Sequence, residues 1–293
     1  MKICKITKLC GWSLGIVFFC TTPACAQNHQ LQTEPVETPS IESRETIVQE
    51  LLKADIVYLG ETHDSPEDHN AQLEILQALY QQNPKIAIAM EMFQRPYQDI
   101  LDRYLAGQIT EAQLIQQTEY EQRWGFPWEY YAPLLRFAKT HQLPVLALNT
   151  PTEVTRKVAR TGLESLTPTE QQHIPPRSEI RTDNAEYRQM IREIYEQHHP
   201  KGQGNSTNFE RFFTAQVLWD ETMAAGIADF VKANPDYQVM VIVGKGHIVY
   251  GYGIPSRVAR RLNTPELVQR SVLFGVPEAV QPDGEKAIAD FFW

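Results

Sequence analysis

The sequence predicts an α/β fold, namely a mostly parallel central sheet flanked by helices, with a helical insertion. Short apolar runs rich in β-branched residues alternate with amphipathic segments of helical length, which is typical of parallel strands joined by helical crossovers. The clearest strand, residues 239–243, is a continuous apolar run that leads directly into Gly244, as expected of a strand buried on both faces. Between residues 152 and 200 the strands stop, and proline breaks separate helical segments.

Local signals place the individual elements. Pro66 suits the first position of a helix, Asn83 and Pro84 end that helix, and leucines at helical spacing make its buried face. Strands are expected at residues 55–59, 85–90, 144–148, 238–243 and 270–274. Helices are expected at residues 41–53, 66–82, 95–105, 110–118, 132–140, 184–197, 209–233 and 257–262. In the longest helix, a stripe at spacings of 3 and 4 indicates a core-facing side, formed by Phe209, Phe212, Phe213, Gln216, Trp219, Met223, Ile227 and Phe230.

The first 26 residues have the organisation of a secretory signal peptide. A basic start with three lysines precedes an apolar core at residues 9–19, which is too short to span a bilayer, and small residues around Cys25 provide a cleavage site. Residues 27–40 are polar, contain two prolines and predict a flexible linker. Residues 41–293 then form a single domain. We therefore expect an exported protein of the periplasm or the cell envelope.

Cysteine usage and charge narrow the class of protein. All four cysteines lie within the predicted signal peptide, so the mature domain uses no disulfide, thiolate metal ligand or cysteine nucleophile. Cys25 leaves two alternatives open, a lipoprotein anchored through this residue or a soluble exported protein; residues 22–24 lack the apolar residue that a lipoprotein signal normally has. The formal net charge of −9 argues against a nucleic-acid partner, which requires a basic face.

Ionisable residues follow three of the predicted strands. Glu61 and His63 come directly after the first strand, Glu91 ends the second, and His247 follows the fourth in a glycine loop. Because the carboxyl ends of parallel strands meet at one edge of a sheet, we expect these side chains to share a site. Carboxylates and neutral imidazoles together bind divalent metals or activate water, and Glu61 or Glu91 would be the base. The alternative is that Glu61, Glu91 and the histidines form a structural hydrogen-bond network, because a single glutamate at a strand end is more often structural than catalytic. Their recurrence after three strands favours the shared site.

Aromatic residues suggest a second kind of ligand. Tyr250 and Tyr252 stand close to His247, and a tyrosinate can be an axial ligand of ferric haem. Trp124 and Trp128 lie in an aromatic loop and would provide an apolar wall for a flat ring. The alternative is that this loop only caps the core.

Five segments, taken in order, resemble the ChaN-like haem-binding uptake proteins, a branch of the wider group that includes the erythromycin esterases and the Tiki/TraB proteins. They are residues 60–64 (GETHD), 90–93 (MEMF), 124–128 (WGFPW), 216–224 (QVLWDETMA) and 246–255 (GHIVYGYGIP). The resemblance spans about residues 47–274. It implies an α/β fold, export to the cell envelope, commonly as a lipoprotein, and haem binding in iron acquisition.

For haem, the resemblance makes Tyr250 the leading candidate ligand, with His247 nearby and with Tyr252, Trp124 and Trp128 holding the ring. An exported haem-binding protein of the cell envelope that acts in haem or iron uptake is therefore the favoured function. An envelope transport partner and a homodimer are further expectations, and membrane association is expected only through a lipid anchor.

For hydrolysis, the wider group uses a Gly-Glu-x-His loop, a glutamate at the end of the next strand and a late histidine. These features map onto Glu61 with His63, onto Glu91 and onto His247. The alternative function is therefore a metal-assisted hydrolase, an esterase or peptidase, with His63, Glu91 and His247 as ligands of a divalent metal.

Overall fold

The computed structural model describes residues 42–198, 206–275 and 286–293, which belong to one compact unit, Ile41–Trp293. The predicted signal peptide (residues 1–26) and the predicted linker (residues 27–40) lie outside the described residues. In the described part of the chain, no helix combines the length and the apolar character that crossing a membrane requires.

The described residues form one six-stranded sheet, in which every pairing is parallel, as the sequence predicts. Its order is β3-β2-β4-β1-β5-β6. The strands are β1 (Ile56–Glu61), β2 (Ile86–Gln94), β3 (Val145–Asn149), β4 (Gln238–Gly244), β5 (Gln269–Leu273) and β6 (Phe291–Phe292). The sequence did not predict β6, a two-residue strand too short to give a periodic pattern. The strands β1, β2 and β4 are buried along their whole length, which explains their continuous apolar runs.

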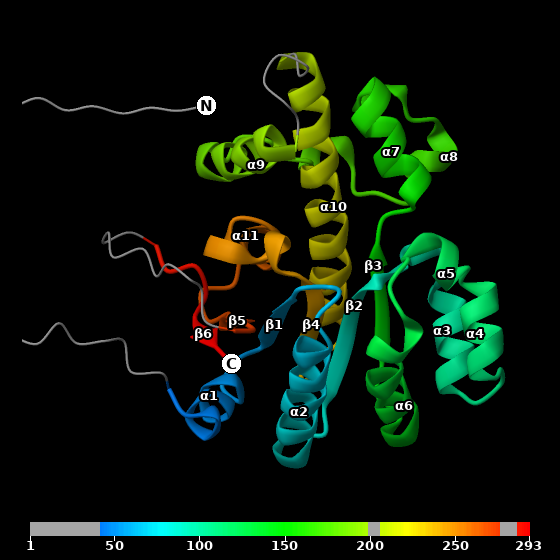
Figure 1. The fold of residues 1–293 in the computed structure, drawn as a ribbon, viewed down its shortest axis with the longest axis vertical. Helices are drawn as coiled ribbons and strands as arrows, with labels where there is room; N and C mark the ends of the chain where they lie inside the picture. Colours follow the sequence, from blue (N-terminus) through cyan, green and yellow to red (C-terminus); the bar gives the residue numbers. More distant parts are fainter. Residues whose placement is uncertain (1–41, 199–205, 276–285) are drawn as a thin grey trace, which may run out of the picture. The chain divides into compact units, whose positions relative to one another are not determined.

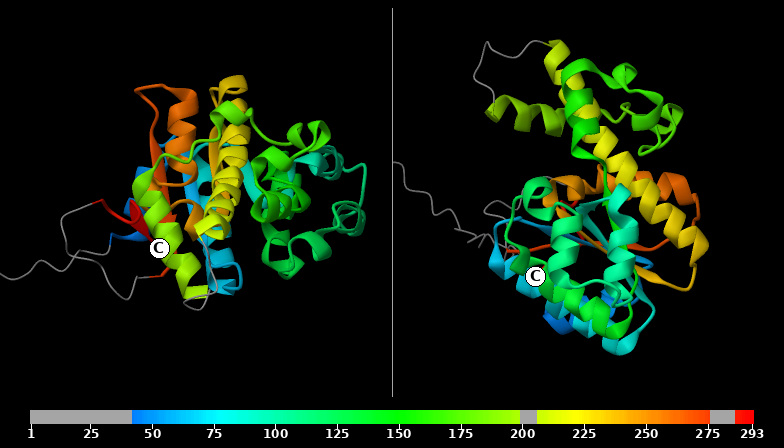
Figure 2. Two further views of the ribbon diagram at one scale, coloured as in Figure 1. Left: turned by 90° about the horizontal axis from the view of Figure 1, so that it is seen from above. Right: turned by 90° about the vertical axis from the view of Figure 1, so that its right-hand side faces the viewer.

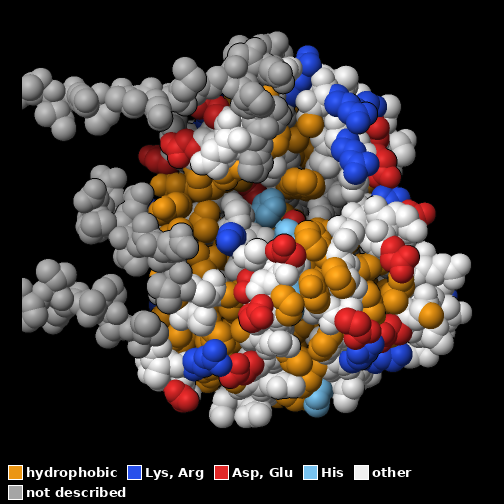
Figure 3. All heavy atoms as spheres, in the orientation of Figure 1, with side chains coloured by type: hydrophobic (Ala, Val, Ile, Leu, Met, Phe, Trp, Pro, Cys, Tyr) orange, Lys and Arg blue, Asp and Glu red, His pale blue; other side chains and the backbone are white. Residues whose placement is uncertain are grey.

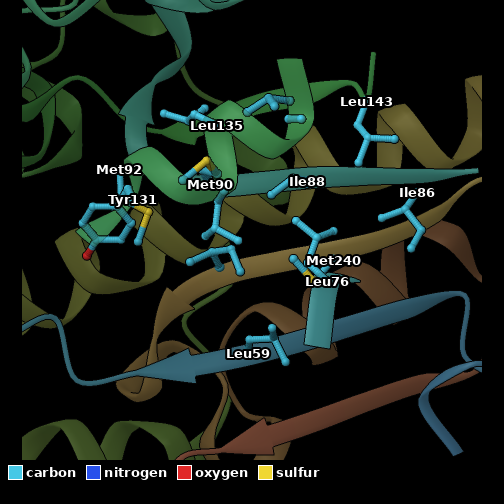
Figure 4. Packing of buried hydrophobic residues seen from close by; sticks show 14 of the residues in the cluster. Leu59, Leu76, Ile86, Ile88, Met90, Met92, Tyr131, Leu135, Leu143 and Met240 are labelled. Carbon is cyan, nitrogen blue, oxygen red and sulfur yellow. The ribbon is translucent and has the colours of Figure 1, made fainter. Parts of the chain in front are cut away.

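Helices cover both faces of the sheet (Figures 1 and 2). One face packs against α1 (Arg44–Leu51), α2 (Pro66–Gln82), α3 (Gln98–Leu105) and α6 (Ala132–His141). The other face packs against α10 (Ser206–Ala233) and α11 (Ile254–Leu262). Figure 4 shows side chains of the first layer, where residues of β1, β2 and β4 meet residues of α2 and α6.

The helical insertion packs on α10, away from the main core. Near its carboxyl end α10 contributes Met223, Ala224 and Ile227 to the core over the sheet. Nearer its start it packs against α7 (Thr152–Thr161) and α9 (Ala185–His198) in two separate apolar clusters. The insertion also contains α8 (Pro168–Gln171), and α4 (Glu111–Gln117) and α5 (Tyr120–Arg123) complete the α-helices of the described chain. Figure 1 shows α7 and α9 beside the upper half of α10.

Two strands extend further than predicted, and this places the first two acids inside the sheet. Glu61 is the last residue of β1, where a loop was expected, and it pairs with Gly244 of β4. Glu91 lies within β2, which continues to Gln94 after a register shift against β3. A strand whose periodicity is hidden by burial on both faces gives no sequence signal for its end.

Candidate functional site

A cavity of about 470 Å³ lies at the carboxyl edge of the sheet, beneath the first half of α10. Its lining comes from β2, β3, the loops after β1 and β4, the aromatic loop, α7 and α10. The lining residues are His63, Glu91, Arg123, Trp124, Phe126, Asn149, Thr152, Thr155, Arg156, Ala159, Phe212, Ala215, Gln216, Trp219 and His247. In Figure 3, histidine side chains are visible in a hollow bordered by hydrophobic side chains.

His63 is held by the buried carboxylate of Glu61. The Nδ1–H of His63 donates to Oε1 of Glu61 over 2.7 Å. Glu61 is 1% exposed and also accepts from the hydroxyl of Tyr131 (2.5 Å) and from the side-chain amide of Gln72 (2.6 Å). With both carboxylate oxygens engaged, Glu61 fixes the ring of His63 and leaves Nε2 of the ring for other partners.

His247 is held in the same way from the opposite side. Its Nδ1–H donates to Oδ1 of Asp220 over 2.7 Å, and its Nε2 lies 3.5 Å from Oε1 of Glu91. Asp220 lies on α10 and is completely buried, and its other oxygen accepts from the hydroxyl of Tyr187 over 2.6 Å. Arg257 of α11 stands 3.8 Å from the same oxygen. Through Asp220, α10 therefore orients the histidine that follows β4.

Glu91 and Gly244 bring the two histidines to one place. Oε2 of Glu91 accepts from the backbone N–H of Gly244 over 2.8 Å, which ties β2 to the end of β4. A Cβ at position 244 would lie 2.9 Å from both Cε1 and Nε2 of His63. Only glycine lets the backbone approach the imidazole this closely. The glycine at the end of β4 therefore makes room for His63.

Burial and nearby charges shift the pKa values of His247, His63 and Glu91 in opposite directions. Burial lowers the pKa of His247, but the charges of Glu91 and Asp220 and their hydrogen bonds outweigh it and raise this pKa to about 10. Burial also opposes the charged form of His63, yet the hydrogen bond to Glu61 and the charge of Glu91 leave its pKa above the usual value. For Glu91, burial raises the pKa, and the attraction of His247 and His63 brings it below the ordinary range. His247 is therefore a cation at neutral pH, paired with two carboxylates.

Tyr250 lies in a different cavity. It borders a space of about 280 Å³ with Tyr58, Arg270 and Lys286, and His247 is not part of that lining. Tyr250 has a φ of 54°, a left-handed conformation rare for a tyrosine, and its ring stacks on Tyr252 at 5.4 Å. This backbone turn separates the side chains of His247 and Tyr250, which the sequence analysis grouped together.

The two tryptophans also separate. Trp124 lines the cavity at the sheet edge and meets the ring of His63 edge-on at 4.9 Å. Trp128 does not line either cavity; its indole N–H donates to Glu111 over 2.9 Å and its ring packs on Tyr120. Trp128 therefore packs against the core, which is the alternative that the sequence left open for the aromatic loop.

The expected divalent-metal site is not supported. Among residues 42–198, 206–275 and 286–293, no group of three or more His, Cys, Asp or Glu side chains is arranged to hold a metal ion. His63 and His247 each donate from Nδ1 to a carboxylate, and one oxygen of Glu91 is engaged by Gly244. What these groups can do is hold and exchange protons beside a cavity.

Sequence reasoning missed Asp220 and misjudged part of α10. Phe212, Gln216 and Trp219 were expected in the core, but they line the cavity. Asp220 was not singled out as a site residue. A carboxylate next to Trp219 in an otherwise apolar helical stripe is a signal that could have identified it, because a buried charge needs a partner.

The fold and this site define an α/β protein with a parallel sheet and two carboxylate-anchored histidines at the carboxyl edge of its strands. The chain belongs to the family described as haem-binding uptake, Tiki superfamily, ChaN, whose sequence model matches residues 47–258.

Three similar proteins were found. The chain is similar to a solved structure of ChaN of Campylobacter jejuni, described as cofacial haem binding, with a TM-score of 0.64 and 21% identity over 86% of this chain and 91% of that one. It is 27% identical to Protein RETICULATA-RELATED 5, chloroplastic, of Arabidopsis thaliana, over 85% of this chain. The chain covers 35% of that relative, about a third of its length. An erythromycin esterase mutant in an open conformation aligns with a TM-score of 0.46 and 15% identity, over 78% of this chain and 72% of that one.

Proposed function

We propose that the protein is an exported haem-binding protein of the cell envelope that acts in haem or iron uptake. The observation that carries this proposal is the family match, which covers residues 47–258 and includes Tyr250 and Tyr252. The similar structure from Campylobacter jejuni is described as binding haem. An envelope transport partner and a homodimer belong to the same proposal.

The residues around Tyr250 suit a haem group. The Tyr250 side chain is half-buried, and its hydroxyl has no hydrogen-bond partner in the described part of the chain, so it is available to a ligand. Arg270 and Lys286 border the same cavity and would pair with the carboxylates of haem. When bound, haem would supply ferric iron, and a tyrosine oxygen is a suitable ligand for that ion. Tyr250 is therefore the proposed ligand, with Tyr252 stacked beside it.

Titration of haemin into the purified protein tests this proposal. We expect a shifted Soret band that saturates at stoichiometric loading, and we expect Tyr250→Phe to lose it. Tyr237→Phe is the matched control, because Tyr237 precedes β4 at the opposite edge of the sheet and packs on Phe230. The absence of a spectral change in the wild type, or an unchanged spectrum in Tyr250→Phe, would contradict the proposal.

Membrane attachment through Cys25 is a separate proposal. It predicts that the exported chain begins at Cys25 and carries lipid, whereas a soluble exported protein begins at or after Ala26. The intact mass of the protein recovered from the envelope distinguishes these outcomes.

A hydrolase is the second candidate function, and the paired histidines favour it. His63 and His247 are each oriented by a buried carboxylate beside one cavity, an arrangement suited to general acid–base chemistry without a metal. An esterase and peptidase screen tests it, with Glu91→Gln and His63→Ala as inactive variants. Activity that survives both substitutions would remove this candidate.

A further inference from the structure

Asn149 places an unpaired hydrogen-bond acceptor at the cavity. It is the last residue of β3 and is 7% exposed. Its Nδ2 donates to the backbone carbonyl of Glu91 over 2.9 Å. Because a carbonyl only accepts, this bond fixes the orientation of the amide and identifies the other atom as Oδ1. Oδ1 of Asn149 has no hydrogen-bond partner within the described residues, although it is buried.

Trp219 contributes an unpaired hydrogen-bond donor to the lining of the same cavity. It lies on α10, lines the same cavity, and meets the ring of His247 edge-on at 6.0 Å. Its indole N–H is buried and has no acceptor among the residues that the structure describes. Buried polar groups in native proteins are paired, so an unpaired donor and an unpaired acceptor at one cavity indicate a ligand that supplies the opposite groups.

The charges around the cavity select a neutral ligand. Glu61, Glu91 and Asp220 are three buried carboxylates, and their nearest cations are His63, His247 and Arg257. This cluster is balanced only when both histidines are protonated. Arg123 and Arg156 also line the cavity, and they are offset by the carboxylates of Glu119 and Glu153. The cavity therefore has no excess positive charge for an anion. Five further lining residues are apolar, namely Trp124, Phe126, Ala159, Phe212 and Ala215. A ligand with a polar neutral group and an apolar, flat group fits both parts.

We propose that this cavity binds a neutral amide that carries an apolar group, with Asn149 Oδ1 accepting from the amide N–H and Trp219 donating to the amide carbonyl. Binding of the amide does not depend on the proposed hydrolase function, and only hydrolysis of the bound amide rests on it. If the protein is a hydrolase, the proposal narrows its substrates from esters and peptides to amides. An ester has no N–H, so it would leave Asn149 unpaired in a buried site. Sites built to bond a donor reject analogues that lack it.

Three probes that differ in a single group test the proposal on the unmodified protein. They are N-methyl-2-phenylacetamide, methyl phenylacetate and phenylacetate. We expect the amide to shift the indole N–H signal of Trp219 and the side-chain amide signals of Asn149 in ¹H–¹⁵N spectra. We expect the ester to bind about 3- to 10-fold more weakly, the loss expected from one unpaired hydrogen bond, and the carboxylate to bind more weakly still.

Variants then assign the effect to Asn149. Asn149→Ala should remove the preference for the amide over the ester, while Asn234→Ala should keep it. Asn234 is a matched control, because it also donates from Nδ2 to a backbone carbonyl but lies after α10, at the far edge of the sheet. Equal binding of the amide and ester by the wild type, or a preference that survives in Asn149→Ala, would overturn the proposal.

The wild-type comparison needs no variant and therefore stands if Asn149→Ala fails to fold. Amide binding without turnover would remove the hydrolase candidate and leave the binding site standing. Turnover of esters without binding of the amide would support the hydrolase candidate and overturn the proposed amide site.

Discussion

The histidine cavity and the Tyr250 cavity are both bordered by the loop after β4, but their side chains are held in different ways. At the sheet edge, His247 and His63 have fixed partners, and those partners, Asp220 and Glu61, have fixed partners in turn. In the second cavity, Tyr250 stands on a left-handed turn, and its hydroxyl has no hydrogen-bond partner in the described chain. The loop after β4 therefore presents an imidazole held by buried carboxylates to one cavity, and a tyrosine hydroxyl without a hydrogen-bond partner in the described chain to the other.

The largest expected difference between the two regions is in stability. Asp220→Ala leaves His247 and the Tyr187 hydroxyl without their buried partner, and should lower the free energy of unfolding by about 3–5 kcal/mol. Tyr250→Phe should change it by less than about 0.5 kcal/mol. Urea denaturation measures both. Asp236→Ala is the control, because Asp236 pairs with Lys85 at the surface, where an ion pair contributes about 0–1 kcal/mol. A similar loss of stability in Asp220→Ala and Asp236→Ala would contradict this prediction.

The pH dependence of stability should come mainly from the sheet-edge cavity. The pKa of His247 is raised to about 10 in the folded protein, from an ordinary value near 6.5. Its contribution is therefore complete below about pH 6.5 and is lost as the pH rises toward 10, at no more than about 1.4 kcal/mol per pH unit. Unfolding measured between pH 6.5 and 9 should show this decline, and Asp220→Asn should flatten it. An equal slope in both proteins would contradict the assignment.

Gly244 and Gly246 should differ in how much an alanine substitution destabilises the protein. Gly244→Ala places a methyl group 2.9 Å from the ring of His63, and overpacking of this kind costs about 1–3 kcal/mol. Gly246→Ala is the matched control, because a Cβ there meets no atom within 4 Å. The difference between the two in unfolding free energy, and a shift of the His63 ring signals only in Gly244→Ala, would place the effect at the histidine.

The smallest expected effect concerns the tryptophan that lines neither cavity. Trp128→Phe loses the hydrogen bond to Glu111, so the free energy of unfolding should fall by about 1 kcal/mol. The haemin spectrum should not change, because Trp128 packs on Tyr120 and Phe93 and not beside Tyr250. A Soret band altered by Trp128→Phe would show that haem reaches the aromatic loop.

The pattern of strands was sufficient to predict that Glu61, Glu91 and His247 converge, because parallel strands place their carboxyl ends at one edge. The same reasoning could not separate His247 from Tyr250. Tyr250 itself has a left-handed backbone conformation, and apolar periodicity contains no information on that backbone angle.

A periodic sequence pattern also could not predict the roles of α10 and of the aromatic loop. Residues of α10 at spacings of 3 and 4 were assigned to the core, but the first half of this helix passes the sheet edge, so Trp219 and Phe212 face a cavity. Trp124 and Trp128 are four residues apart, and only the tertiary packing of the loop decides that Trp124 faces His63. Periodicity predicts the type of an element, whereas these contacts depend on the position of the element in the tertiary structure.

We propose that haem binds through Tyr250, in a place separate from the histidine cavity. The affinity of haemin for Tyr250→Phe, set beside its affinity for His63→Ala, tests this most directly. We predict that Tyr250→Phe loses the Soret shift and weakens binding at least 10-fold, while His63→Ala binds as the wild type does. Retention of haem by Tyr250→Phe together with its loss in His63→Ala would place the ligand in the other cavity and contradict the account.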